Sequence, residues 1–522
     1  MKSLPSALRH PPESPQGSAA PDSAPPVALL RVLSFFSGGA VMMVEFSGNR
    51  LLAPSFGNSL YTWTALIGVI LLALSCGDFL GGWLVDRVPR LGLLPILFSL
   101  GGVLTTAIPL LARMLPDTST MDLVWGPAIV SLGLFFLPGL VLASITPVSI
   151  RLLSKALADA SIGKSAGTVG MAAALGSLAG TITTSYVLLP VFGVRQILFM
   201  LGGLLLILGL FLGFLWRRQL FRTGNLVSLL VVGAILQATG AIPPRVDPKI
   251  LFARDTYYHR ISVSTMPVHG GETARLLKLD STYEGAQVIE TGELLFDYQH
   301  YWRLAEVFCP NLEHALFLGA GAFGMPEKIS GRYPQAVVDV VEIDPAVVEV
   351  GRRFFRLDEF PKVNTHAVDA RRFLQATPVH YDFIFGDAYN GVQYIPAHLV
   401  TREFFAGVAG RLTDQGVFVM NLISSLKGEL FWRVLNSLRV SFPHTQVYAS
   451  NGDPDVQQNL IIVASPADLD QRSQQFRTDD EALGRLLATR VDLPEQPLSR
   501  KLFTDDCNPV EYVVAQQLRK PE

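Results

Sequence analysis

The chain has 522 residues and a formal net charge of -2, and only 16% of its residues are charged. This length predicts two or more domains, and the near-neutral charge gives no reason to propose nucleic acid as a partner. The mean hydropathy of +0.36 is high for a soluble enzyme and indicates membrane-spanning segments. Three cysteines, with no His/Cys spacing typical of a zinc site, exclude a disulfide framework and predict no metal site.

The amino-terminal half predicts a multi-pass α-helical membrane domain over residues 27–242. Residues 1–26 are rich in Pro, Ser and Ala and have no apolar face, which predicts a disordered tail. The apolar stretch that follows is too long for a signal-peptide core, so we expect a retained anchor. Stretches of about 20 apolar residues, the length that crosses a bilayer, recur at 27–46, 60–84, 92–113, 123–148, 167–190, 196–216 and 226–242. We therefore expect about seven helices, membrane lipid as a partner, and the cell (inner) membrane as the location.

Basic residues predict the orientation of these helices. Arg and Lys gather in three alternate loops, at 87–90, 151–164 and 217–222, whereas the loops between them hold single arginines. Because positively charged loops stay in the cytoplasm, the amino terminus and the three basic loops are expected there. If 226–242 crosses the membrane, the carboxyl-terminal half lies outside the cytoplasm; if that stretch lies at the interface, the half stays inside.

The stretch 81–90 (GGWLVDRVPR) resembles the loop between helices two and three of major-facilitator transporters. Pro89 stands where that loop usually has Gly, so the resemblance is partial. It implies a major-facilitator-like membrane half.

From residue 243 the long apolar runs give way to shorter patterns. A linker, 243–254, leads into 255–311, where apolar and polar residues alternate around a Gly270-Gly271 turn, which predicts a small β-hairpin domain. From 312 to 522, strands alternate with helical segments, which predicts an α/β Rossmann-type domain with a parallel sheet. Its expected strands lie at 314–318, 336–342, 364–368, 381–386, 416–421, 444–449 and 459–464.

A glycine-rich turn after the first of these strands predicts a nucleoside site. Three glycines have the spacing that allows a tight turn, close ligand approach and close helix contact: Gly319, Gly321 and Gly324. Three acids end further strands, where ligands of open α/β sheets bind: Glu342, Asp369 and Asp387. Glu342 stands at about the 20-residue distance expected of a carboxylate that binds ribose hydroxyls. The alternative is that these acids cap helices or solvate turns.

The carboxyl-terminal half resembles the spermidine synthase (polyamine aminopropyltransferase) family, and the whole chain resembles its membrane-fused members. Beyond the glycine turn, the resemblance rests on 276–280 (LLKLD), 296–298 (FDY), 394–404 (YIPAHLVTREF), 502–506 (LFTDD) and 509–511 (PVE). It covers roughly residues 255–511 and implies the fold of class I methyltransferases. It also implies aminopropyl transfer to putrescine or a related amine from decarboxylated S-adenosylmethionine, a co-substrate and not a tightly bound cofactor. A second copy of the chain is a further candidate partner.

The resemblance also implies roles for individual residues. Asp387 takes the catalytic position, where a carboxylate would hold the attacking amine and accept its proton. Glu342 is expected to bind the ribose hydroxyls, and Asp369 with Ala370 the adenine. Four more residues are expected to contact the substrates: His259, which aligns with a Gln of the family, Tyr298, Gln299 and Asn390.

The amine end of this expected site departs from the family pattern. Ala322 stands where the family's glycine loop has the Asp that binds the aminopropyl ammonium, and Asn390 replaces a second Asp. A cationic chain in a desolvated pocket needs negative partners, and three other acids are sequence candidates for that role: Glu284, Asp505 and Asp506. Three functions therefore stay open: a membrane-bound aminopropyltransferase, another transferase that uses S-adenosylmethionine, and a transporter or sensor that binds a nucleoside or polyamine without turnover.

Overall fold

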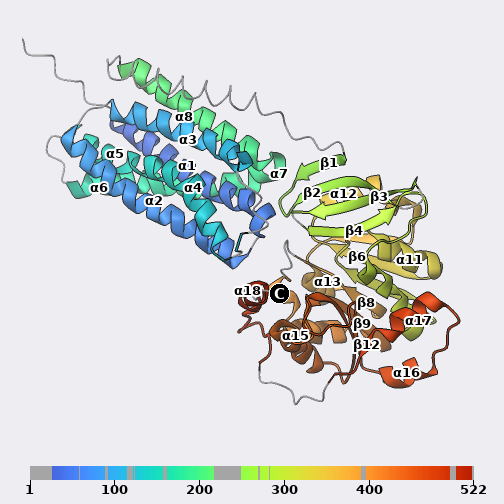
Figure 1. The fold of residues 1–522 in the computed structure, drawn as a ribbon. Helices are drawn as coiled ribbons and strands as arrows, with labels where there is room; N and C mark the ends of the chain where they lie inside the picture. Colours follow the sequence, from blue (N-terminus) through green and yellow to red (C-terminus); the bar gives the residue numbers. More distant parts are fainter. Residues whose placement is uncertain are drawn as a thin grey trace, which may run out of the picture.

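The structure, a computed structural model, describes residues 26–519 except 58, 89–91, 115–120, 123, 157–161, 217–248, 269–270, 281, 390–394 and 494–500. Three units follow one another along the chain: a bundle of apolar helices, a four-stranded sheet, and an eight-stranded sheet with helices on both faces (Figure 1). Some predictions fall outside the described residues: nearly all of the tail 1–26, the first half of the linker 243–254, the seventh span 226–242, and Asn390.

The first unit consists of α1 (Val27–Phe56), α2 (Leu60–Arg87), α3 (Leu93–Met114), α4 (Gly126–Ala143), α5 (Ile145–Ala156), α6 (Ile162–Ile182), a π-helical turn (Thr183–Leu188), α7 (Leu189–Val191) and α8 (Val194–Trp216). In the described part of the chain, six helical segments are long and apolar enough to cross a membrane. They coincide with the first six predicted spans, and α4 and α5 together make the fourth.

Small residues let these helices pack closely. A Cβ atom at Gly176 in α6 would lie 1.9 Å from the carbonyl oxygen of Phe35 in α1, and one at Gly38 would lie 2.1 Å from that of Ala173. Only glycine allows backbones to approach this closely, which is a common way for helices to associate in lipid. On the outside of the bundle, large apolar side chains such as Phe79 are exposed, which suits a surface that faces lipid.

The second unit is an antiparallel meander of β1 (Ile250–Asp255), β2 (Arg260–Pro267), β3 (Thr273–Leu279) and β4 (Thr282–Val288), in the order β1-β2-β3-β4. Its first strand begins ahead of the predicted boundary at 255, because residues from Ile250 onward pair with β2. A 3-10 helix (Asp297–Arg303) and α10 (Leu304–Phe308) then lead into the third unit. Ile261 of β2 shares one hydrophobic core with Phe317 of the next sheet, so the second and third units are packed together.

The third unit contains every strand expected after residue 312, as β5 (His314–Leu318), β6 (Val337–Glu342), β7 (Val363–Ala367), β8 (Tyr381–Gly386), β9 (Leu412–Ser424), β10 (His444–Ala449) and β11 (Gln458–Ser465), followed by β12 (Arg490–Val491). The strand order is β12-β10-β11-β9-β8-β5-β6-β7. Strands β5 to β9 pair in parallel, but β11 is antiparallel to β9 and to β10. The predicted parallel sheet is therefore confirmed for β5 to β9, but the whole sheet is mixed, because β11 runs antiparallel to both of its neighbours.

The helices of this unit are α11 (Gly324–Arg332), α12 (Pro345–Phe354), α13 (Ala370–Ala376), α14 (Arg402–Ala409), α15 (Glu429–Arg439), α16 (Leu469–Gln475), α17 (Glu481–Ala488) and α18 (Val510–Arg519), with single 3-10 turns at Leu357–Glu359 and Ala397–Leu399. Both faces of the sheet are covered, and alternate residues of each strand enter different cores. In β6, for example, Val340 points to one core and Val341 to the other, which explains the continuous apolar pattern of these strands.

The strand order reverses between β5 and β8, since β6 and β7 follow β5 on one side while β8 and β9 lie on the other. In open α/β sheets, ligands bind at such a switch point, beyond the carboxyl ends of the strands. Gly319 follows β5 with a φ of 100°, and a Cβ atom there would lie 2.3 Å from the carbonyl oxygen of Asp387, which follows β8. Glycine at 319 is thus required, and it brings the glycine turn against Asp387.

The second and third units meet the helical bundle at one end (Figure 1). Arg50, near the end of α1, donates through Nη1 to the carbonyl oxygen of Tyr258 at 2.8 Å. The backbone N–H of Leu60, at the start of α2, donates to the carboxylate of Glu511 in α18 at 2.5 Å.

Candidate functional site

A cavity of about 350 Å³ lies at the carboxyl ends of β5, β6 and β8. The structure brings these sequence-predicted residues together in its lining: Gly319, Gly321, Glu342, Asp369, Ala370, Asp387 and His259. The 256–259 turn and the helical bundle complete the wall, and the bundle contributes Asn49, Arg50, Trp63 and Leu189. One cavity is therefore built from all three units of the fold.

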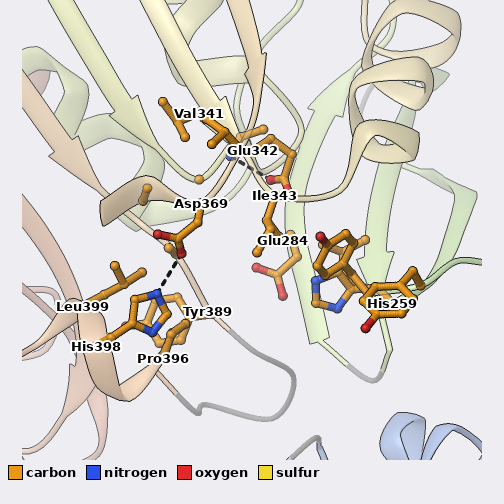
Figure 2. A pocket seen from close by; sticks show the side chains of 18 of the residues that line it. His259, Glu284, Val341, Glu342, Ile343, Asp369, Tyr389, Pro396, His398 and Leu399 are labelled. Atoms are coloured by element: carbon orange, nitrogen blue, oxygen red, sulfur yellow. Dashed lines mark hydrogen bonds and ion pairs between the residues drawn. The ribbon is translucent and has the colours of Figure 1, made fainter. Parts of the chain in front are cut away.

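Glu342 ends β6 and is only 7% exposed. Its Oε1 accepts the N–H of Asp344 at 2.9 Å, and its Oε2 accepts the N–H of Ala320 in the glycine turn at 3.2 Å (Figure 2). Burial raises the pKa of this carboxyl, and the two N–H donors and His259 oppose the rise. A carboxylate has about four lone-pair sites, so Glu342 can accept further hydrogen bonds, such as those from a pair of hydroxyls.

Asp369 is the N-cap of α13, where its side chain accepts the N–H of Arg372 at 3.0 Å. Its Oδ2 also lies 2.8 Å from Nε2 of His398 (Figure 2). Burial would raise the pKa of Asp369, but the Arg372 N–H and His398 outweigh it and the pKa is lowered. One oxygen of Asp369 therefore caps a helix, as the alternative interpretation of the sequence had it, and the residue also lines the cavity. Ala370 begins α13, and N–H groups of a first helical turn have no intrahelical partner.

Asp387 follows β8, and its Oδ1 accepts a hydrogen bond from Nδ2 of Asn421 at 2.9 Å. Asn421 is itself fixed, because its Oδ1 accepts from Nδ2 of Asn459 at 2.9 Å. Burial raises the pKa of Asp387 to about 6, against the opposing hydrogen bond from Asn421. A carboxylate whose pKa lies this close to neutrality is suited to accept a proton during a reaction.

Glu284, on β4, lines the same cavity (Figure 2). Burial, together with the negative charges of Asp387, Glu342 and Asp280, raises the pKa of its carboxyl well above the usual value. The other two acids that the sequence offered for the amine end lie elsewhere. Asp505 pairs with Arg371 at the surface, and Asp506 is exposed. Glu284 is therefore the one of the three that faces the site.

His259 lies on the far side of Glu284 from Asp369 (Figure 2). Its Nδ1 is 3.1 Å from Oδ2 of Asp280. Burial lowers the pKa of His259, but the hydrogen bond and charge of Asp280 more than offset this and the pKa is raised.

Three predicted site residues stand behind the cavity wall. Gly324 begins α11 and packs closely against Leu294, because a Cβ atom at residue 324 would lie 2.4 Å from Cδ2 of Leu294. The hydroxyl of Tyr298 donates to the carbonyl oxygen of Glu284 at 3.2 Å. Gln299 is 2% exposed, and its Nε2 lies 3.2 Å from where a Cβ of residue 285 would stand.

Sequence reasoning missed several lining residues: Tyr257, Tyr258, Ile343, Tyr389 and His398. The sequence could have indicated Tyr389 and His398, because both lie in or next to the motifs that follow β8. In the parts of the chain that the structure describes, no group of three or more His, Cys, Asp or Glu side chains could hold a metal ion.

Comparison with known proteins agrees with this geometry. A model of the spermine/spermidine synthase domain matches residues 300–465. The polyamine aminopropyltransferase of Vibrio vulnificus is 30% identical over 245 residues, which cover 42% of this chain and 76% of that protein. The chain belongs to the polyamine aminopropyltransferase family. This is a family of transferases.

Other relatives extend the comparison. The polyamine aminopropyltransferase 2 of Aquifex aeolicus is 21% identical over 432 residues, 78% of this chain and 82% of that protein, so its similarity continues into the helical half. Further proteins of the family are matched over 60% and 50% of their own length. Among solved structures, a probable spermidine synthase from Corynebacterium glutamicum is 20% identical with a TM-score of 0.39, over 46% of this chain and 85% of that one.

Proposed function

We propose that the chain is a membrane-bound aminopropyltransferase that uses decarboxylated S-adenosylmethionine and a small amine such as putrescine. One observation carries the proposal: the glycine turn, the ribose-binding candidate Glu342 and the basic carboxylate Asp387 line one cavity at the switch point of the sheet. The family membership supplies the reaction type, and the cavity supplies a nucleoside site with an acid placed to take a proton.

In this reaction the amine nitrogen attacks the carbon beside the sulfonium. A C–N bond forms, the C–S bond breaks with its electron pair passing to sulfur, and 5′-methylthioadenosine leaves. The amine must lose a proton, and Asp387, with its pKa near 6, is the acceptor that the cavity offers. Glu342 would hold the ribose hydroxyls, while Asp369 and Ala370, which line the cavity at the start of α13, would contact the base.

The test is transfer by the purified full chain in detergent. Incubation with decarboxylated S-adenosylmethionine and putrescine should yield a triamine and 5′-methylthioadenosine in equal amounts by mass spectrometry. A parallel reaction with S-adenosylmethionine tests the methyltransferase alternative, in which a methylated product would appear. Absence of the triamine from an enzyme that binds 5′-methylthioadenosine would refute aminopropyl transfer to putrescine.

We also infer on which side of the membrane the cavity lies. The contacts with the helical half come from the end of α1 and the start of α2, through Arg50 and Leu60. The basic residues gather at the opposite helix ends, where Arg151 of α5 pairs with Asp86 of α2 at 3.2 Å. Since basic loops stay in the cytoplasm, the cavity would face away from it. This arrangement requires the chain to cross the membrane an odd number of times before the second unit. Seven spans were predicted, and the seventh, 226–242, lies outside the described residues.

This orientation favours a second candidate function. Sulfonium nucleosides are made in the cytoplasm, so a cavity on the other side would need its donor delivered there. The same site could instead bind a nucleoside or amine for sensing or transport without turnover. Nucleoside binding with no product from either donor would favour this second function.

A further inference from the structure

We propose that Glu284 is the residue that binds the ammonium group of the amine substrate, working as a pair with Asp387 across the inner end of the cavity. The inference rests on the proposed function for the identity of the reaction, but its geometry and its test concern amine binding alone.

Residues 284 and 285 pack directly against the glycine turn. A Cβ atom on Gly285 would lie 2.6 Å from Cβ of Ala322, and one on Gly321 would lie 2.8 Å from the carbonyl oxygen of Glu284. This close fit needs glycine at 285 and a small residue at 322, which is 2% exposed. As a result, the side chain of Glu284 enters the cavity beside the glycine turn, and Figure 2 shows its carboxylate pointing into the space between Asp369 and His259.

Within the described part of the chain, the Glu284 carboxylate has no hydrogen-bond donor or ion-pair partner. It is half-buried in the cavity lining, and the charges that act on it, from Asp387, Glu342 and Asp280, are all negative. Carboxylates that lie close together without a cation disfavour one another's charge, and the position is therefore suited to a cation that arrives with the ligand.

The surrounding side chains fit an alkylammonium. Tyr389 lines the cavity and Tyr298 stands behind its wall, and the charges of Glu284 and Asp387 raise the pKa values of both hydroxyls in addition to the effect of burial. Carboxylates beside an aromatic ring such as that of Tyr389 form a suitable site for an ammonium group, since ring faces also attract cations. With the amine bound, one carboxylate can keep its charge and hold the cation while Asp387 takes the proton.

The experiment measures the Kd of putrescine by calorimetry, using the full chain in detergent saturated with 5′-methylthioadenosine. Glu284→Gln keeps the shape and removes the charge, and losing one charge-assisted hydrogen bond should weaken binding roughly 10- to 100-fold. Glu284→Asp, which keeps the charge on a shorter side chain, should lose less. Glu293→Gln is the matched control, because Glu293 is exposed a few residues further along the chain and should leave the Kd unchanged.

The Kd of 5′-methylthioadenosine, unchanged in all variants, shows that each is folded.

The proposal is overturned if Glu284→Gln binds putrescine within twofold of the unmodified protein, or if the unmodified protein binds no putrescine. Failure of the transfer assay with these Kd changes intact would instead refute only the proposed reaction.

Discussion

Replacement of Asp387 by Asn isolates its part in proton transfer, because the surroundings of this side chain can stay unchanged. Asn421 donates Nδ2 to Oδ1 of Asp387, and its orientation is held by Asn459. An Asn at 387 offers the same Oδ1 acceptor, so the cavity should keep its shape. What the variant loses is the group that can accept a proton.

The expected loss follows from that role. Positioned general bases contribute about 100- to 10,000-fold to rate, so kcat for amine transfer at about pH 8 should fall by that factor. Because burial raises the pKa of Asp387 to about 6, its basic form is depleted below that pH. For the unmodified enzyme, kcat/KM should then fall about tenfold per pH unit below about pH 6. An unperturbed Asp would keep its basic form down to about pH 4.

The assay is a series of initial rates between about pH 5 and pH 9, with 5′-methylthioadenosine release as the readout and its Kd as the control for folding. Asp387→Asn should bind the nucleoside within about twofold of the unmodified enzyme and should lose the acidic limb near pH 6. If the variant retains more than a tenth of the activity, or keeps the same acidic limb, Asp387 is not the base.

Three further predictions test other parts of the structure. Glu342→Gln should weaken 5′-methylthioadenosine binding about tenfold or more in calorimetry, since it puts an amide N–H against the donors of Ala320 and Asp344; unchanged affinity would place the ribose elsewhere. Cys507 is exposed, so a membrane-impermeant maleimide should label it in intact spheroplasts if the cavity faces away from the cytoplasm, and labelling only after lysis contradicts that orientation. Burial raises the pKa of Glu327 from 4.5 to about 7, so its charge lowers folded stability as pH rises from about 4.5 to 7. Glu327→Gln should therefore stabilise by up to about 3 kcal/mol at pH 8 and by little at pH 4, and equal shifts of the melting temperature at both pH values would argue against it.

Local patterns were enough to predict that the glycine turn and the acids that follow other strands lie together. A glycine turn after one strand and acids after others must meet, because parallel strands end at the same edge of a sheet. The strand positions followed from the same alternation of apolar runs and helical segments. The antiparallel part of the sheet could not be predicted in this way, because the apolar pattern of a central strand is the same whether its neighbour runs parallel or antiparallel.

The amine end and the outer wall depend on contacts between units. Whether Glu284 faces the cavity depends on the register of β4 against the glycine turn, and a shift of one residue would point it the other way. The contact between Arg50 and Tyr258 joins residues 208 positions apart, for which no local pattern exists. The role of Asp369 could not be decided from the sequence either. This residue both caps a helix and lines the cavity, so the two interpretations were not exclusive.

The central claim is that one cavity holds an adenosyl group and an amine against the same acids. A cryo-electron microscopy structure of the full chain with 5′-methylthioadenosine and putrescine tests it most directly. We predict ribose hydroxyls within hydrogen-bond distance of Glu342 and an amine nitrogen between Asp387 and Glu284. A nucleoside bound outside this cavity, or one bound with its sulfur remote from Asp387, would contradict the account.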